Sequence, residues 1–291
     1  MSVALHRTTT VAAESARKTS PRRGERKSWW LFTVMVVVTG VILIPVLATF
    51  VLSVRLLNAP PGAAQFGFEN FVQVFGATDV VIWLTNSLIV TLVTMVVAII
   101  IAAPAGYVLS RGRNKLVSSY AMGLFVIQSL PVITAIIPLF ILFVNLGLQD
   151  SLVGVAIIYV GGAMSVAIWM MAAYFDTIPI NLEEAAWMDG ASVFGGFVRV
   201  VLRNSFPGIL STAIFTFLLA WNDYLVAVIF LRSSQNFTLP VGLQSFFQQN
   251  TTDWGPIMAV SVVMMLPPII LFAFLNRYFS VGGIGGALAG R

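Results

Sequence analysis

The chain has 291 residues, of which 58% are hydrophobic and only 9% are charged, and its mean hydropathy is +0.94. Soluble domains carry about 25% charged residues, so a chain this poor in charge requires lipid as its solvent. It has no cysteine, and its single histidine, His6, lies in a polar N-terminal segment. Disulfides, thiolate metal sites and histidine chemistry in the core are therefore excluded. The net charge of +5 is better explained by basic cytosolic loops than by nucleic-acid binding.

Residues 1–28 form a first distinct region, because they are polar, basic and rich in Ser, Thr and Arg. A segment of this composition cannot bury a core, so we predict a disordered cytosolic tail; a specific binding role is the alternative. The apolar run that follows is too long for the h-region of a signal peptide and has no small-residue cleavage site after it. Residues 29–291 are therefore expected to form one transmembrane domain.

Six apolar stretches are long enough to cross a bilayer, which takes about 20 residues. They cover residues 29–54, 83–109, 120–146, 152–173, 207–231 and 256–278. We therefore predict an all-α integral membrane protein with six transmembrane helices. Pro131 and Pro138 are expected to kink the third span. No internal repeat is visible, whereas an inverted repeat would have favoured a secondary transporter.

The distribution of Lys and Arg predicts the orientation of these spans. Fourteen of the 16 basic residues fall in the N-terminal segment, the loop near residue 112, the loop 174–204 and the C-terminal residues, and only Arg55 and Arg232 fall on the other side. By the positive-inside rule both termini and these two loops face the cytosol, and loops 55–82 and 232–255 face outward.

The loop 174–204 has the pattern of two helices joined by a tight turn. Asn181 is expected to cap the first helix, Glu184 three residues later completes a capping-box pattern, and Gly190 ends the helix. Ser192 is expected to cap the second helix. One face of that helix would carry its apolar residues, which are Phe194, Phe197, Val198, Val201 and Leu202. The opposite face would carry Arg199 and Arg203.

The first of these helices has the features of a docking element. Ala185 and Ala186 leave it with little side-chain bulk, so another surface can approach its backbone closely. Glu183, Glu184 and Asp189 are expected to rim it with negative charge. Such a helix suits a groove on a cytosolic partner, although a capped inter-span helix without any partner explains Glu184 as well.

The stretch Glu184-Ala185-Ala186-Trp187-Met188-Asp189-Gly190 resembles the EAA motif of the permease subunits of ABC importers. In that motif Glu-Ala-Ala, three residues and Gly are followed by nine residues and Ile-x-Leu-Pro. Val200 and Leu202 match the later part, whereas Arg203 stands where the motif has proline. The segment Asp189-Gly190-Ala191 is similar to the carbohydrate-type subfamily.

The resemblance extends from about residue 30 to the end of the chain. Asn86-Ser87, Tyr107 with Arg111, and Trp221-Asn222-Asp223 resemble elements of sugar permeases. Residues 236–243 resemble the outer loop of maltose-permease G-type subunits, and residues 282–287 resemble their Gly-rich C-terminal tail, which can reach toward the ATPase dimer. The resemblance implies the type I ABC-importer permease fold, with the coupling loop at 174–204 and the Gly-rich tail at 279–291.

In that family the EAA loop is the coupling helix, which sits in a cleft of the ATP-binding subunit. The resemblance therefore implies a role in ATPase coupling for the residues Glu183, Glu184, Ala185, Ala186, Met188, Asp189 and Gly190. The chain itself has no G-x-x-x-x-G-K-[ST] phosphate loop and no soluble ligand-binding domain.

These absences indicate which functions belong to partners. ATP and Mg²⁺ are expected on a partner ATPase, of which the resemblance implies two copies, while this chain is expected to bind no cofactor or metal and to catalyse no reaction. The resemblance implies a second, homologous permease and an extracytoplasmic sugar-binding protein, assembled in a bacterial inner membrane.

Asp223 is the one acidic residue inside a predicted span, where a charge costs about 2.5–3.5 kcal/mol. Such residues usually face a wet cavity, and with Trp221 and Asn222 this one forms a cluster that suits a sugar ring. Asn86 and Gln128 are further candidates for a substrate pathway. The alternatives are a position near the outer interface and a hydrogen bond between helices, which is the commoner role of polar residues in spans.

The sequence thus predicts the permease subunit of an ATP-driven sugar importer, which couples hydrolysis in a partner to alternating access. A different solute, such as a glycerol phosphodiester, would suit the same permease pattern, but no Lys or Arg lies deep within a predicted span to bind phosphate. One alternative is a stand-alone secondary transporter or channel, which would work without an ATPase. Another is a subunit that takes part in a membrane assembly but transports nothing. Both functions stay open at this point.

Overall fold

The computed structural model describes residues 25–56, 65–247 and 253–279. Within these ranges the regular structure is helical, apart from an isolated antiparallel bridge between Arg55 and Phe66. Most of the expected tail, residues 1–24, and the Gly-rich segment 280–291 lie outside the described residues. Residues 25–28, which we expected in the tail, instead form the first turn of α1 (Glu25–Val54).

The chain divides after Ala48 into two units, and the first contains most of α1. This helix is apolar on every side, and the side chains of its span, from Trp29 onward, are largely exposed. A helix without a polar face is suited to lipid rather than to water.

Among the described residues, four helices are long and apolar enough to cross a membrane. They are Trp29–Val54 within α1, α3 (Val80–Arg111), α6 (Leu152–Phe175) and Trp254–Leu275 within α13 (Trp254–Phe279). Two further pairs of helices pass the same test only together, because each pair is bent at a short break: Lys115–Ser129 with Ile133–Asn145, and Val193–Asn204 with Phe206–Trp221. These pairs give up to six spans if each counts as one. The prediction of an all-α membrane protein is thus confirmed for the described ranges.

The predicted span 120–146 is not one straight helix. It is divided into α4 (Lys115–Ser129) and α5 (Val132–Asn145), which meet at 97°. Pro131 causes the break, because it disfavours helical geometry at Leu130, which is extended with ψ 125°. The expected kink at Pro131 is confirmed, whereas Pro138 lies inside α5 without interrupting it.

The predicted span 207–231 is also divided, so a continuous helix was the wrong prediction. It consists of α10 (Phe206–Trp221) and α11 (Leu225–Phe230), separated by residues 222–224. Oδ1 of Asp223 accepts the N–H groups of Val226 at 3.1 Å and Ala227 at 3.2 Å. The carboxylate therefore caps the first turn of α11.

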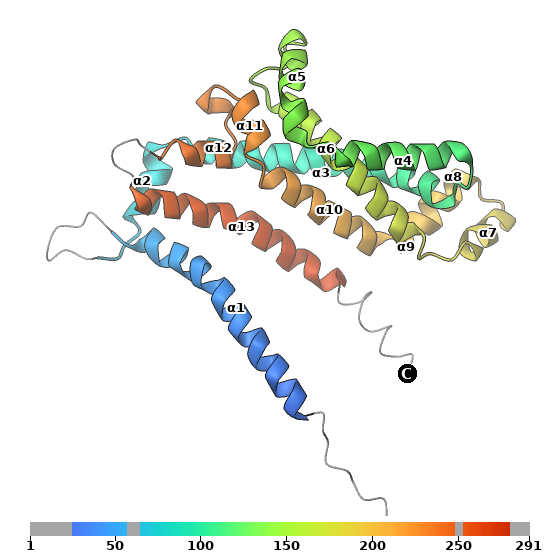
Figure 1. Ribbon diagram of the computed structural model, residues 1–291, viewed down its shortest axis with the longest axis horizontal. Coiled ribbons are helices and arrows are strands. Elements are labelled where there is room, and N and C mark those ends of the chain that lie inside the picture. The colour runs from blue at the N-terminus through green and yellow to red at the C-terminus, as the bar shows by residue number, and fades with distance from the viewer. Residues whose placement is uncertain (1–24, 57–64, 248–252, 280–291) are drawn as a thin grey trace, which may run out of the picture. The chain divides into compact units, whose positions relative to one another are not determined.

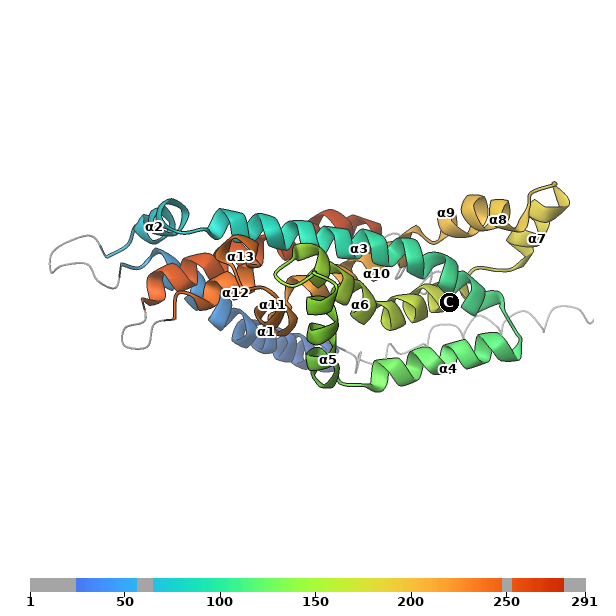
Figure 2. The same cartoon turned by 90° about the horizontal axis from the view of Figure 1, so that it is seen from above.

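The core of the second unit is built on α3 and α6, which lie side by side and are joined by α10 (Figures 1 and 2). Near the end of α3, Gly106 lets the two helices approach closely. A Cβ atom added there would lie 2.8 Å from Cβ of Met171 and 3.0 Å from the backbone N of Ala172. Small residues at such crossings are how membrane helices pack without a strong hydrophobic driving force between them.

Short elements close the other end of this unit. They are α2 (Glu69–Ala77), the 3₁₀ turn η2 (Ser234–Asn236) and α12 (Leu239–Gln244). The side chain of Asn70 in α2 donates to the carbonyl oxygens of Ser53 and Arg55, at 2.9 and 3.0 Å. The indole of Trp83 donates to the carbonyl of Ser234 at 3.0 Å, which fixes the turn on α3.

Candidate functional site

The loop between α6 and α10 begins with helix α7 (Asn181–Met188), which starts differently from the prediction. Its N-terminal flanking residue is Ile180, whose φ and ψ of −61° and −27° are already helical, and no side chain caps it. The prediction that Asn181 and Glu184 form a capping box is therefore wrong. Glu184 is exposed, and its side chain makes no hydrogen bond to another described residue. Capping thus no longer explains this carboxylate.

The C-terminal end of α7 is as predicted. Gly190 adopts a φ of +87°, which only glycine reaches without strain. The N–H of Gly190 bonds to the carbonyl of Trp187 at 3.0 Å, and the N–H of Ala191 bonds to that of Ala186 at 2.9 Å. These two bonds make a Schellman motif, which ends the helix sharply and fixes the direction of the following chain.

Glu183 does not rim the exposed surface, contrary to our expectation, because its side chain is completely buried. Its Oε1 lies 2.6 Å from Nη2 and 2.8 Å from Nε of Arg111, and its Oε2 accepts the hydroxyl of Tyr107 at 2.7 Å. Arg111 also donates to the carbonyl of Ile178 at 3.1 Å. The first turn of α7 is thereby bound to the last turn of α3.

The outer side of the loop is apolar and exposed. Met188 is 88% exposed and Phe194 72%, and Leu182 and Trp187 are also open. Ala185 is exposed beside them. Figure 2 shows α7 and α8 (Val193–Gly196) at one end of α3, beyond the packed helices. Exposed groups of large apolar side chains are typical of surfaces that contact another protein or a membrane.

The second helix of the loop is capped as predicted but winds differently. Oγ of Ser192 accepts the N–H of Gly195 at 3.0 Å. A π-helical segment (Phe197–Val201) then separates α8 from α9 (Leu202–Asn204). Its wider turn places Phe197 and Val201 in the core but leaves Phe194 and Val198 exposed, so the single apolar face that we predicted is wrong. Arg199 and Arg203 are exposed, as expected.

A second candidate site is a cavity of about 270 Å³ beside the break between α10 and α11. Its polar lining residues are Gln128 of α4, Tyr159 of α6 and Asp223. The hydroxyl of Tyr159 donates to Oδ1 of Asp223 at 2.7 Å. The structure thus brings together Gln128 and Asp223, which the sequence predicted, and adds Tyr159, which nothing in an apolar span had singled out. The walls are apolar and include Leu219 and Ile229.

The other predicted pathway residues do not line this cavity. Trp221 is buried, stacks on Phe217 with a centroid distance of 5.6 Å, and donates to the carbonyl of Met264 at 3.2 Å. Asn86 donates to the carbonyls of Gln235 and Phe237 at 2.8 and 3.0 Å. Asn222 is exposed and bonds back to Leu218 within α10. These contacts hold helices and turns together, as polar residues in spans commonly do.

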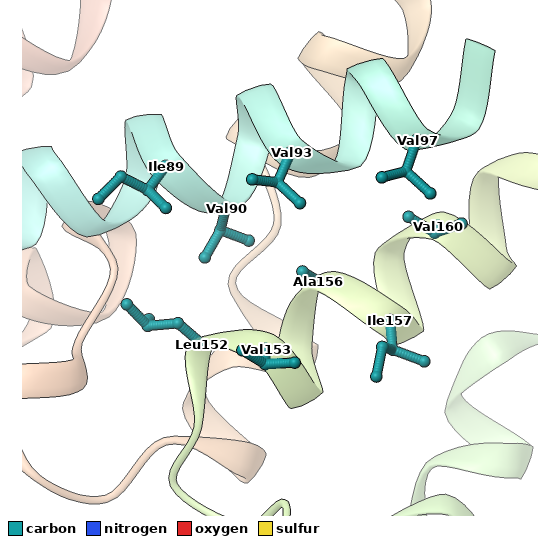
Figure 3. A pocket seen from close by; sticks show the side chains of 9 residues that line it. All are labelled: Ile89, Val90, Val93, Val97, Leu152, Val153, Ala156, Ile157 and Val160. Carbon is teal, nitrogen blue, oxygen red and sulfur yellow. The ribbon is translucent and has the colours of Figure 1, made fainter. Parts of the chain in front are cut away.

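A separate hollow of about 250 Å³ lies between α3 and α6. In Figure 3 the side chains of Val90 and Val93 on α3 point toward α6. Every residue that lines it is apolar: Ile89, Val90, Val93, Val97, Leu152, Val153, Ala156, Ile157 and Val160. A sugar hydroxyl placed there would lose its hydrogen bonds to water without replacement, so the Asp223 cavity is the better solute site. Among the described residues, no group of three or more His, Cys, Asp or Glu could hold a metal ion.

A family model described as "Binding-protein-dependent transport system inner membrane component" matches residues 96–281, which include α7 and the Asp223 cavity. The chain belongs to this family. Its members are transport subunits rather than enzymes, and the predicted ABC permease family is confirmed.

Individual relatives cover most of the chain. The inner membrane ABC transporter permease protein YcjP of Escherichia coli (strain K12) is 36% identical over 228 residues, or 78% of this chain and 81% of that protein. The maltodextrin transport system permease protein MdxG of Bacillus subtilis is 31% identical over 255 residues, which are 86% of this chain and 92% of that protein. The trehalose transport system permease protein SugB of Mycobacterium tuberculosis is 30% identical over 284 residues, which are 92% of this chain and 100% of that protein.

A solved structure supports the fold. A chain from a bacterial ABC transporter involved in the import of the acidic polysaccharide alginate superposes with a TM-score of 0.76 at 20% identity. The match covers 90% of this chain and all of that one. The predicted type I ABC-importer permease fold is therefore confirmed.

Proposed function

We propose that this chain is the permease subunit of an ATP-driven importer that takes a sugar from an extracytoplasmic binding protein and carries it across the bacterial plasma membrane. The observation that carries the proposal is helix α7, which ends in a Schellman motif and presents Glu184, Ala185 and Met188 outward. No contact within the described residues accounts for this surface. The sugar is supported by the names of relatives, two of which are maltodextrin and trehalose permeases.

Helix α7 is proposed to dock into a cleft of the partner ATPase. Glu184 and Asp189 would supply charge, Met188 apolar contact, and Ala185 and Ala186 room for close approach. Gly190 would hold the end of the helix in its bound direction. Each ATPase partner carries its own ATP and Mg²⁺, because this chain has no phosphate loop.

The assembly that we propose contains two ATPase subunits, a second homologous permease and the binding protein. In this arrangement α4 with α5 forms the third span and α10 with α11 forms the fifth, which gives six spans. Both termini and α7 then lie on the cytosolic side. The excess of Lys and Arg on that side supports this orientation.

The cargo is proposed to pass the cavity at Asp223. A carboxylate, a phenol and an amide there offer acceptors and donors for hydroxyl groups, while Leu219 and Ile229 suit the apolar face of a sugar ring. Among the described residues no Lys or Arg lines the cavity. That charge pattern disfavours a phosphodiester, which would need cations from the second permease.

The proposed mechanism is alternating access. ATP closes the two ATPase subunits, α7 follows that closure, and the cavity opens toward the docked binding protein. Hydrolysis and release then return the cavity to the cytosolic side. Only a ligand with different affinities for the two states can shift their populations, so ATP must bind the outward-open state more tightly.

The test is reconstitution of the complete importer in proteoliposomes with its ATPase, second permease and binding protein. We expect ATP-dependent uptake of labelled maltotriose or trehalose and none of a glycerol phosphodiester. Glu184→Lys should abolish uptake while the chain still inserts, and Glu69→Lys on α2 is a control that changes an exposed carboxylate elsewhere. Normal uptake by the Glu184 variant would refute the docking role, and phosphodiester uptake would refute the sugar.

A further inference from the structure

The ion pair between Glu183 and Arg111 lies between the coupling loop and the transmembrane helices. Glu183 is 0% exposed and the side chain of Arg111 18%. Removing a carboxylate from water is costly unless it is paired and fully hydrogen-bonded. Here Oε1 receives two N–H groups of Arg111 and Oε2 receives the hydroxyl of Tyr107. Both oxygens are therefore satisfied, by residues four positions apart on one face of α3.

Two adjacent carboxylates of α7 face in different directions. Glu184 is exposed on the side available to a partner, whereas Glu183 points inward to α3. Because neighbouring helical residues are about 100° apart, one turn of α7 can contact a partner and α3 at once. A displacement of the face that carries Glu184 is therefore transmitted to α3 through the adjacent residue, Glu183.

The contact of Glu183 with α3 is directional, unlike the packing contacts of α7 and α8. Trp187 packs on Gly196, where an added Cβ would lie 2.8 Å from its Nε1, and this holds α7 and α8 together through close packing. Tyr107 lies 4.7 Å from Phe197 between ring centroids. The end of α3 therefore contacts both helices of the loop, and only Glu183 adds charged hydrogen bonds of fixed geometry among these residues.

Arg111 also binds the part of the chain that precedes α7. Its guanidinium donates to the carbonyl of Ile178 at 3.1 Å and to Oγ of Ser110 at 3.1 Å. A lateral shift of α7 would break several charge-assisted bonds together, whereas a movement shared with α3 would break none.

We infer that Glu183, held by Arg111 and Tyr107, is the positioning residue that makes α3 follow α7 when the ATPase subunits close. The inference rests on the proposed function. Through α3 the displacement reaches α6 and α10, which pack along it. The exposed EAA residues receive the movement, and the buried glutamate beside them passes it into the membrane domain.

The first experiment separates coupling from folding in the reconstituted importer. We compare Glu183→Gln, Arg111→Lys and Tyr107→Phe with the wild type for complex recovered, ATP hydrolysis and sugar taken up per ATP hydrolysed. Glu69→Gln on α2 is the matched control, because it makes the same change at an exposed carboxylate that lies outside this network.

For Glu183→Gln we expect uptake per ATP to fall about tenfold, within the range of about 5–150-fold that is typical of coupling between sites. ATP hydrolysis per complex should persist, and the control should behave as wild type. The Glu183→Gln/Arg111→Lys double variant should take up as much sugar per ATP as the less active of its two single variants, because both residues act in one contact. A loss of complex with unchanged uptake per ATP would overturn the inference and leave only a structural role.

A second measurement does not depend on these variants folding. The chain has no cysteine, so spin labels on cysteines at the exposed positions Val108 and Asn181 report one distance between α3 and α7. In the complete importer this distance should be the same with and without ATP. A distance that changes with nucleotide in the wild type would overturn the inference. A wild-type chain that recruits no ATPase would instead refute the proposed function.

Discussion

The hydroxyl of Tyr159 on α6 donates a 2.7 Å hydrogen bond to Oδ1 of Asp223, in the break between α10 and α11. The same oxygen accepts the N–H groups of Val226 and Ala227. One carboxylate therefore joins two helices, caps a third and lines the cavity. A hydroxyl of a passing solute would have to share these acceptor positions.

Asp223→Asn should weaken sugar uptake by about tenfold or more, because a hydrogen bond to a charged group is worth about 1.5–3 kcal/mol. Tyr159→Phe should have a smaller effect, since the carboxylate remains. The measurement is the initial rate of uptake against sugar concentration in proteoliposomes. Asn222→Ala is the control, because among the described residues the side chain of this exposed neighbour bonds only to Leu218. Equal uptake by the Asp223 variant and the control would remove the cavity from the pathway.

Gly106→Ala should destabilise the folded protein by about 1–3 kcal/mol, the usual cost of overpacking. The added methyl group would meet the backbone N of Ala172 at 3.0 Å, and a backbone atom cannot turn aside. Thermal unfolding of the chain in detergent measures the effect. The control is Gly40→Ala in α1, where an added Cβ meets nothing within 4 Å. An unchanged melting temperature for the Gly106 variant would show that α3 and α6 are less closely packed than this geometry requires.

Gly190→Ala should weaken recruitment of the ATPase. Space is not limiting, since nothing lies within 4 Å of a Cβ there, but a φ of +87° costs a residue with a side chain about 1–2 kcal/mol. The end of α7 would relax and its docking face would turn. Co-purification of the ATPase with the variant measures this, and Gly123→Ala in α4, at an open site without positive φ, is the control. Full recruitment by both variants would contradict a fixed helix end.

Asp150 supports a pH-dependent contribution to stability. Partial burial alone would raise the pKa of this carboxyl, but hydrogen bonds from the N–H groups of Arg232 and Ser233 and from the Ser233 hydroxyl outweigh it and lower the pKa below 3.8. A depressed pKa in the folded state means that the stabilisation is present above the ordinary carboxyl pKa. It is lost as the pH falls through the folded value.

Asp150→Asn tests that contribution. Asparagine tolerates the positive φ of 51° at this position, so the backbone should be preserved. We expect the wild type to melt higher than the variant at neutral pH and the difference to disappear at a pH well below 3.8. A difference that persists unchanged at low pH would show that the charge is not its origin.

The sequence predicted the elements that depend on local rules. The Pro131 kink, the Ser192 cap and the Gly190 stop follow from backbone geometry within a few residues, and the structure confirms each. The Asn181 cap failed because the chain is already helical at Ile180, so that Asn181 lies inside the helix rather than before it.

What could not be predicted depends on partners that are distant in the sequence. Glu183 and Glu184 are alike in the sequence, and only the end of α3 decides which of them is buried. Tyr107 and Arg111 are spaced for one helical face, and that spacing was the available signal for a carboxylate partner. Asp223 and Gln128 were separate candidates in the sequence, and the cluster of Asp223 with Trp221 was wrong because Trp221 is buried against Phe217 and bonds to Met264.

The π-helical segment Phe197–Val201 contains one residue more per hydrogen-bonded turn than an α-helix. Deleting Val198 would restore α-helical winding and rotate everything before it by about 100° around the helix axis. Helix α7 would then be turned relative to α10, although Glu184, Ala185, Ala186 and Gly190 would remain. The orientation of the coupling loop therefore depends on the number of residues between Gly190 and Leu202 as well as on their identity.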